Sequence, residues 1–171
     1  MASNIEIKAR ARNFAEQAAK ARAIADQPPV VSPQEDVFFH IPVGRFKLRV
    51  FSDDKGELIW YERPDTGEAR RSLYERYPTR EPRLLQDILS RALGIRGKVV
   101  KVRTLFMKGS TRIHFDDVEG LGQFIELEYV MDEHAEQSEG DLEIRRIMDE
   151  LGIRDEDLVG GAYMDLLEGK L

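Results

Sequence analysis

The chain has 171 residues, of which 42% are hydrophobic and 34% charged, and it contains no cysteine. This length predicts a single domain over residues 1–171, with a core that needs no disulfide or structural metal. The missing cysteine excludes a thiol nucleophile, a zinc–thiolate site and a disulfide framework, and it suits a reducing cytoplasm.

The charge and hydropathy patterns exclude further classes of protein. The net charge of −6 argues against broad binding to nucleic acid or to anionic membranes. Apolar runs are only a few residues long, far short of the roughly 20 residues of a membrane span, and residues 1–6 lack the apolar centre of a secretory signal. We expect a cytoplasmic monomer or homodimer with neither a nucleic-acid nor a membrane partner.

The first half of the chain predicts a strand, a helix and a group of hairpins. Residues 4–10 alternate between apolar and polar side chains, which is the period of a half-buried strand. Residues 11–26 change to three- and four-residue steps and predict a helix. Prolines make residues 30–33 a loop or a short edge segment. Four short strands follow, at residues 38–41, 45–51, 57–63 and 71–77.

The second half begins with a helix and repeats the strand pattern. Pro82 suits the first turn of this helix and Gly94 its end. Its apolar stripe consists of Leu84, Leu85, Ile88, Leu89 and Ala92. Three strands follow at residues 98–106, 111–118 and 123–131, and then helices at about residues 138–151 and 156–167, with interruptions at Gly152 and at Gly160–Gly161.

The charged faces of the strands are expected to share one surface. An antiparallel sheet usually turns such a face to water. Here the helices need the apolar strand faces, so the charged faces should line the interior of a curved or closed barrel in an α+β fold. They carry nine basic residues (Lys8, Arg10, Arg45, Lys47, Arg49, Arg63, Lys101, Arg103 and Arg112) and four acidic ones (Glu6, Asp116, Glu126 and Glu128). A bound polyanion would relieve the repulsion among these cations.

Two of the acids have the spacing of a cation site. Glu126 and Glu128 are two residues apart on one strand, so both carboxylates face the same side, about 7 Å apart along the chain. Carboxylates among basic residues suit Mg²⁺ or Mn²⁺ shared with substrate phosphates, and do not suit a zinc cage.

These residues resemble the CYTH, or triphosphate tunnel, superfamily, which includes class IV adenylyl cyclases, thiamine triphosphatases and inorganic triphosphatases. Residues 4–8 (Asn-Ile-Glu-Ile-Lys) resemble the family's Glu-x-Glu-x-Lys first strand, and residues 44–49 its basic second element. Residues 58–65 and the Ser72-x-Tyr74 pair are similar to the strands that follow. Residues 111–128 are the most specific stretch, and they are similar to bacterial proteins labelled class IV adenylyl cyclase-like.

The resemblance implies an eight-stranded antiparallel tunnel that holds a small-molecule triphosphate and one or two divalent cations, Mg²⁺ or Mn²⁺. The implied metal ligands are Glu6, Glu126 and Glu128. Asp116 is implied as a further ligand or as a residue that contacts a ligand. The implied phosphate-binding residues are Lys8, Lys47, Arg49, Arg63, Lys101, Arg103 and Arg112. The implied catalytic residues are Glu6, Lys8, Glu126 and Glu128. Arg10 and Arg45 lie nearer strand ends, as charges at the rim.

Two positions depart from the family pattern. Asn4 stands at the first acid of the signature, and its neutral amide should weaken a second cation site, which favours one-metal chemistry. Arg63 stands where many relatives carry lysine, which preserves phosphate binding but changes its geometry.

The resemblance leaves two enzymes open that bind the same triphosphate group. Attack by water on the terminal phosphoryl group gives a triphosphatase for inorganic, nucleoside or thiamine triphosphate, which we favour. Attack by a ribose 3′-hydroxyl on the α-phosphorus gives an adenylyl cyclase, whose nucleoside recognition the sequence does not locate. A non-catalytic polyphosphate or nucleotide sensor is a third hypothesis. A lipocalin-like binder of apolar ligands is a fourth, and the charged interior argues against it.

Three further features have two interpretations each. His114 is a general base on the charged face or, as we prefer, a hydrogen-bonded structural histidine. Trp60 and Tyr61 stack a nucleobase or, as we prefer, serve in packing alone. The C-terminal helix over residues 163–167 closes one mouth of the tunnel or simply packs on the barrel.

Overall fold

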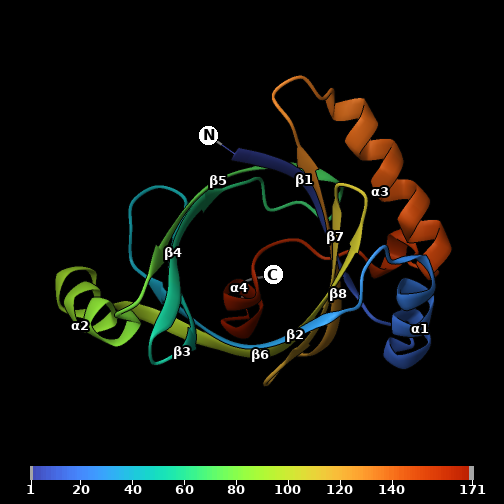
Figure 1. Cartoon of the computed structure of the whole chain (residues 1–171). Helices are drawn as coiled ribbons and strands as arrows, with labels where there is room; N and C mark the ends of the chain where they lie inside the picture. The colour runs from blue at the N-terminus through green and yellow to red at the C-terminus, as the bar shows by residue number, and fades with distance from the viewer. Residues whose placement is uncertain (1, 170–171) are drawn as a thin grey trace.

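Eight antiparallel strands form one closed barrel in the computed structural model, which describes residues 2–169 (Figure 1). Around the barrel the strands follow the order β1-β5-β4-β3-β2-β6-β7-β8. The predicted α+β fold with a closed eight-stranded barrel is therefore confirmed. Residue 1 and residues 170–171, at the ends of the predicted domain, lie outside the described residues. Within residues 2–169, no helix is long and apolar enough to cross a membrane.

Each predicted strand is present, and most are longer than predicted. The strands are β1 (Ala2–Arg10), β2 (Val30–Phe39), β3 (Arg45–Ser52), β4 (Lys55–Glu62), β5 (Arg70–Thr79), β6 (Ile95–Lys108), β7 (Thr111–Val118) and β8 (Gly122–Met131). The helices are α1 (Phe14–Ile24), α2 (Pro82–Leu93), α3 (Gln137–Leu151) and α4 (Tyr163–Leu167), with a 3₁₀ turn at Asp155–Asp157. Helix α1 starts later than predicted because Asn13 caps it, accepting a hydrogen bond from the amide of Glu16.

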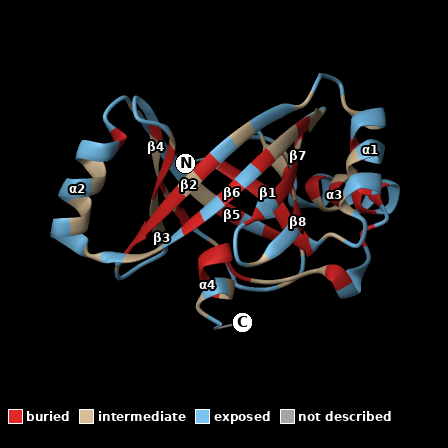
Figure 2. Cartoon of the chain, turned by 90° about the horizontal axis from the view of Figure 1, so that it is seen from below, coloured by how far each residue is buried: buried red, intermediate tan, exposed pale blue. Residues whose placement is uncertain are grey.

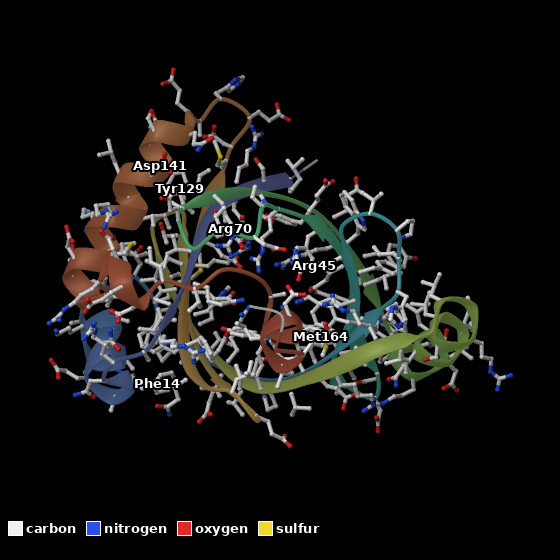
Figure 3. All side chains as sticks on the ribbon, turned by 180° about the vertical axis from the view of Figure 1, so that it is seen from behind. Phe14, Arg45, Arg70, Tyr129, Asp141 and Met164 are labelled. Atoms are coloured by element: carbon white, nitrogen blue, oxygen red, sulfur yellow. The ribbon has the colours of Figure 1, made fainter. Side chains whose placement is uncertain are left out.

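The main hydrophobic core lies on the outer face of the barrel. Side chains of β1, β7 and β8 pack there against α1 and α3. Phe14 of α1, outside the ring of strands in Figure 3, meets Phe115 of β7 edge to face, with 5.3 Å between the ring centroids. Strand β6 alternates between buried and exposed residues over 99–103, whereas residues 3–9 of β1 are all buried, on both faces of the sheet; Figure 2 shows the chain coloured by burial. The two-residue period of a strand thus sends one set of side chains under the helices and the other into the barrel.

Helix α2 uses only part of its predicted apolar stripe. Pro82 occupies its first turn, as predicted, and a glycine at φ +78° ends it. Leu85 and Leu89 pack against the outer faces of β2 and β3. Leu84 and Ile88 are each 54% exposed, so the stripe is wider than the strand surface that it covers.

Of the two predictions for residues 30–33, the loop is wrong and the edge segment is confirmed, because this part of β2 is a strand that pairs on one side only, with β6. β2 runs from Val30 to Phe39 and pairs with β6 along that length. Pro33 has no backbone N–H to donate. It is tolerated because β3 pairs with β2 only from Glu35 onward, so no hydrogen bond is lost on the side toward β3.

Within the predicted helix at residues 156–167 only the 3₁₀ turn and α4 are helical, and the expected interruption at Gly160–Gly161 is present but longer than predicted. Between these two elements Gly161 adopts φ +75°. Val159 donates its amide to the carbonyl of Lys8, and the carbonyl of Gly161 accepts a hydrogen bond from the Lys8 ammonium group. Contacts with the barrel therefore fix the path of the interrupted segment.

Helix α4 lies at one mouth of the barrel. It sits within the ring of strands in Figure 1, and its residue Met164 is labelled there in Figure 3. Tyr163 and Met164 pack against inward side chains such as Phe38 and Val99, which form an apolar cluster inside the barrel. Of the two interpretations of the C-terminal helix, the structure supports closure of a mouth.

Candidate functional site

A cavity inside the barrel is lined by every strand except β7, together with the start of α4. Its charged lining residues are Glu6, Lys8, Asp36, Lys47, Arg49, Arg63, Arg76, Lys101, Arg103, Glu126 and Glu128. Neutral polar and aromatic side chains complete the wall, among them Asn4, Ser72, Tyr61, Tyr74 and Tyr163. The predicted charged interior is therefore present, with cations and carboxylates side by side.

Asp36 of β2 gathers three of the basic residues. Its carboxylate accepts hydrogen bonds from Arg49 Nε at 2.8 Å and Nη2 at 2.9 Å, and from Lys47 Nζ at 2.7 Å. Lys101 Nζ stands 3.9 Å from the same carboxylate. Burial opposes the charge on Asp36, but the cations outweigh burial and hold its pKa well below the usual range.

Asp116 of β7 is a second buried anchor. Arg103 donates Nε and Nη2 to its two oxygens, each at 2.7 Å, and Tyr163 donates its hydroxyl at 2.7 Å. Burial opposes the charge on Asp116, but Arg103 and Lys101 lower its pKa. Asp116 is 0% exposed and does not line the cavity. Its oxygens are therefore engaged with donors, and Arg103 Nη2 joins this carboxylate to that of Glu126.

Glu6 and Lys8 occupy consecutive inward positions of β1. Glu6 forms an ion pair with Arg63. Lys8 Nζ donates to the carbonyl of Gly161 at 2.8 Å and lies 3.5 Å from Glu126 Oε1. Burial lowers the pKa of Lys8, and Glu126 opposes this effect. Lys8 thus links the first strand to Glu126 of β8 and to the segment before α4.

Three groups that can ligate a metal ion meet where β7 pairs with β8. His114 lies opposite Glu126 in the ladder, and one ligand atom each from His114, Glu126 and Glu128 lie within 4.8 Å of one another. Glu128 Oε1 is 3.7 Å from His114 Nδ1, while Glu128 Oε2 accepts a hydrogen bond from Arg112 Nε at 3.0 Å. Glu126 Oε2 accepts a hydrogen bond from Arg103 at 3.1 Å.

The protonation states of these three groups suit a bound cation. Burial opposes ionisation of Glu126, but Lys8 and Arg103 outweigh it and hold its pKa well below the usual range. For Glu128 the polar neighbours His114 and Arg112 outweigh burial and lower its pKa to about 2. Burial lowers the pKa of His114 to about 3, so its imidazole is neutral at pH 7. Two carboxylates and a neutral imidazole are groups that bind divalent cations.

Two buried lysines in the cavity have weakened basicity. Burial and the neighbouring Arg49 lower the pKa of Lys47 to about 8. Burial and Arg103 lower the pKa of Lys101 to about 7, and Lys101 Nζ stays 3.9 Å from both Asp36 and Asp116. A bound polyanion would favour the charged form of both side chains.

The predicted site residues divide into those that line the cavity and those that lie beside it. Lining residues are Glu6, Lys8, Lys47, Arg49, Arg63, Lys101, Arg103, Glu126 and Glu128. Arg112 lies beside the cavity and contacts Glu128. Arg45 pairs with Asp65 at 2.6 Å and with Asp165 of α4 at 2.7 Å. Arg10 is exposed and lies over the ring of Phe124. The catalytic, phosphate-binding and metal-binding roles of these residues stay predictions.

Sequence reasoning missed several lining residues, including Asp36, Arg76 and Tyr163. Residues 34, 36 and 38 follow the same two-residue period as the other strands, so the signal for Asp36 was present but lay next to the supposed loop. Tyr163 gave no such signal, because its position follows from the path of residues 158–162 across the barrel mouth.

The fold and the cavity together define a closed antiparallel barrel with carboxylates and cations on its inner wall. The chain belongs to the CYTH domain family, whose model matches residues 2–163. A putative adenylate cyclase of Methanocaldococcus jannaschii is 25% identical over 140 residues, which cover 78% of this chain and 80% of that protein.

Solved structures share the fold. A protein of Pyrococcus horikoshii superposes with a TM-score of 0.85 at 23% identity, covering 96% of this chain and 99% of the other. A Hippeastrum protein superposes with a TM-score of 0.69 at 14% identity, covering 99% and 96% of the two chains. That protein is described as a putative adenylyl cyclase with a dominant triphosphatase activity.

Proposed function

We propose that the protein is a divalent-metal-dependent phosphohydrolase that acts on a triphosphate group bound inside the barrel. The observation that carries this proposal is the gathering of seven cations around a cavity that also holds ionised carboxylates. These cations are Lys8, Lys47, Arg49, Arg63, Arg76, Lys101 and Arg103. Arginines bind phosphate oxygens through two parallel hydrogen bonds and lysines act as point charges, so the wall matches a compact polyanion.

The acids hold these cations in position before substrate binds. Asp36 orients Arg49 and Lys47, and Asp116 orients Arg103. A phosphate chain would therefore meet donors whose geometry is already fixed, and preorganised donors stabilise developing charge better than mobile ones. The Lys101 ammonium group has no hydrogen bond within residues 2–169, lies 3.9 Å from both Asp36 and Asp116, and is available to a phosphate oxygen.

The chemistry follows from this wall. Water attacks the terminal phosphorus in line, the bond from that phosphorus to the bridging oxygen breaks, and orthophosphate leaves with the shortened phosphate chain. Glu6, Glu126 and Glu128 would hold Mg²⁺ or Mn²⁺, which neutralises phosphate oxygens and supports in-line displacement. The cationic residues stabilise charge on the breaking bond.

Adenylyl cyclase is the second candidate, and the name of the Methanocaldococcus jannaschii relative favours it. This activity needs a nucleobase site. The Tyr61 ring is already approached by Arg45, Lys47 and Arg63, whose charged groups lie 5.4–5.9 Å from its centroid. Trp60 does not line the cavity, and its indole donates to the carbonyl of Val43 at 3.2 Å. The aromatic side chains named from the sequence therefore support packing more than base stacking, and we favour hydrolysis.

Product identification tests the proposal. The protein is incubated with ATP, thiamine triphosphate and tripolyphosphate in the presence of Mg²⁺ or Mn²⁺, and the products are separated by chromatography. Orthophosphate from any of the three supports a triphosphatase and ranks its substrates. Cyclic AMP with pyrophosphate would establish the cyclase instead. Binding of tripolyphosphate without any turnover would leave a non-catalytic sensor.

A matched control separates true turnover from a contaminating phosphatase. A Lys20→Ala variant changes an exposed side chain on α1, outside the barrel, and is expected to keep full activity. An Arg49→Ala variant purified in the same way removes a cavity cation and should lose most of it. Equal activity in both preparations would assign the phosphate release to a contaminant.

A further inference from the structure

His114 is a buried histidine without a partner for one ring nitrogen. Its side chain is 4% exposed, and Nδ1 has no hydrogen-bond partner among residues 2–169. A buried polar atom without a partner costs free energy, so it calls for an explanation. The interpretation of His114 as a hydrogen-bonded structural histidine does not account for Nδ1.

The unpartnered nitrogen lies near a carboxylate that has one oxygen without a hydrogen bond. Glu128 uses Oε2 to accept from Arg112, which leaves Oε1, at 3.7 Å from His114 Nδ1, without a hydrogen bond in the described part of the chain. Glu126 contributes a third ligand atom within 4.8 Å of the other two. Two ligands of one cation, each bound at about 2.1 Å, stand at most about 4.2 Å apart. Small side-chain rotations are enough to bring all three atoms onto one ion.

We propose that His114 supplies an imidazole nitrogen to a divalent-cation site completed by Glu126 and Glu128, and that this nitrogen makes the site prefer Mn²⁺ or another first-row transition ion to Mg²⁺. The preference follows from ligand chemistry, because Mg²⁺ favours an all-oxygen octahedron and retains its water, whereas transition ions accept imidazole. The proposal names the cofactor of the proposed hydrolase, but the binding itself does not require turnover.

On the other side of β8, β1 places Glu6 opposite Glu128 in the ladder, but Glu6 is paired with Arg63. Asn4 of β1 is 3% exposed, and its Oδ1 has no hydrogen-bond partner within the described chain. A neutral amide there attracts a cation less strongly than a carboxylate would. Because Glu6 is engaged by Arg63 and Asn4 carries no charge, the β7 side, where His114 Nδ1 has no hydrogen-bond partner among the described residues, is the better place for a third ligand. Because Glu126 and Glu128 line the cavity and His114 does not, the ion would lie in the cavity wall.

Electron paramagnetic resonance of Mn²⁺ tests this assignment without any substrate. The full chain is freed of metal with a chelator and titrated with Mn²⁺, and bound ion is counted from the loss of the aqueous Mn²⁺ signal. Electron spin-echo modulation of the bound ion then reports whether a ¹⁴N nucleus is directly coordinated. Competition with Mg²⁺ gives the preference, which we expect to be at least about tenfold in favour of Mn²⁺.

His114→Asn is the informative variant, and His40→Asn is its control, because His40 is exposed and lies away from the acids. We expect His114→Asn to weaken Mn²⁺ binding about tenfold or more, to abolish the ¹⁴N modulation and to reduce the preference over Mg²⁺. His40→Asn should change none of these. If His114→Asn unfolds, His114→Gln supplies a second test, and thermal melting verifies the fold of each variant.

The outcomes separate this inference from the proposed function. Mn²⁺ binding with unchanged affinity and unchanged ¹⁴N modulation in a folded His114 variant would overturn the assignment. Equal affinity of the wild-type protein for Mg²⁺ and Mn²⁺ would overturn the preference. A protein that binds Mn²⁺ through nitrogen but hydrolyses no triphosphate would keep the site and refute the hydrolase.

Discussion

Tyr163 donates its hydroxyl to Asp116 at 2.7 Å, which ties the first residue of α4 to the inward face of β7. The two residues are 47 positions apart in the chain. The same carboxylate is held by Arg103, so the helix at the barrel mouth and the cationic wall share one anchor. The Tyr163 ring also lies 4.0 Å from Lys8 Nζ and 5.0 Å from Lys101 Nζ. Closure of the mouth and the arrangement of the site are therefore coupled.

Tyr163→Phe should destabilise the protein by about 2 kcal/mol, because a buried carboxylate loses one of its donors while the ring is retained. For a chain of this size the melting temperature should fall by roughly 4–8 °C. Urea unfolding measures the change. Tyr129→Phe, on the outer side of the barrel in Figure 3, is the control and should shift stability by less than about 0.5 kcal/mol. Equal shifts in the two variants would contradict a special role for the Tyr163 hydroxyl.

Glu128→Gln should abolish metal-dependent turnover and leave the fold intact. The amide keeps the size of the side chain but removes one of two negative charges from the group that also contains Glu126 and His114. Phosphate release at saturating Mg²⁺ and at saturating Mn²⁺ measures the effect, and circular dichroism monitors the fold. Near-normal activity in this variant would remove Glu128 from the metal ligands.

Asn4→Glu should lower the concentration of Mg²⁺ or Mn²⁺ that half-maximal turnover requires. Asn4 lines the cavity, two positions before Glu6 on the same face of β1, so the new carboxylate adds charge beside an existing one. Metal titrations of the variant and of the wild-type protein at fixed substrate give the shift. An unchanged requirement would mean that position 4 lies away from the bound cation.

Polyanion binding should weaken as the pH rises above about 7, because Lys101 has a pKa of about 7 in the empty cavity. A bound phosphate chain favours charged Lys101 and raises this pKa, so binding takes up a proton and loses affinity at high pH. Lys101→Arg stays charged throughout this range and should bind with a flatter pH dependence. Calorimetric titration with tripolyphosphate from pH 6 to 9 compares the two proteins, and the ligand's own titration is common to both. Identical profiles would exclude Lys101 as the source.

Asp36→Asn should cost about 3–5 kcal/mol of stability, because it leaves Arg49 and Lys47 buried without their counter-charge. Added tripolyphosphate should recover more stability in this variant than in the wild-type protein, since the freed cations gain a new partner. Urea unfolding with and without the ligand measures both effects. Glu35→Gln, which alters a partly exposed acid on the outer face of the same strand, should change stability by less than about 1 kcal/mol. A ligand effect of equal size in all three proteins would place the phosphate away from Asp36.

Most of the barrel could be predicted from the sequence because alternation of side chains carries the necessary information. In β1 the same period that places Ile5 and Ile7 under the helices places Glu6 and Lys8 in the cavity. Once the strands are known, the composition of their charged faces predicts the character of the interior.

The parts of the fold and of the site that the sequence did not predict depend on tertiary contacts. Pro33 suggested a break in β2, but the one-sided pairing of that segment made its missing amide harmless. Gly160 and Gly161 predicted an interruption, but the path of residues 158–162 depends on hydrogen bonds from Lys8 and Arg63 to Gly161. Asp36 and Tyr163 become visible as parts of the site only when these two segments follow their true paths.

The position of α4 has a consequence for how a substrate would enter the barrel and how products would leave it. With one mouth occupied by Tyr163 and Met164, the tunnel is a blind-ended chamber for a linear anion. A phosphate chain would thread in end first through the opposite mouth, and whatever remains after cleavage would back out by the same route. The product that lies deepest in the chamber would leave last. Release of that product, rather than bond cleavage, would then limit the turnover rate.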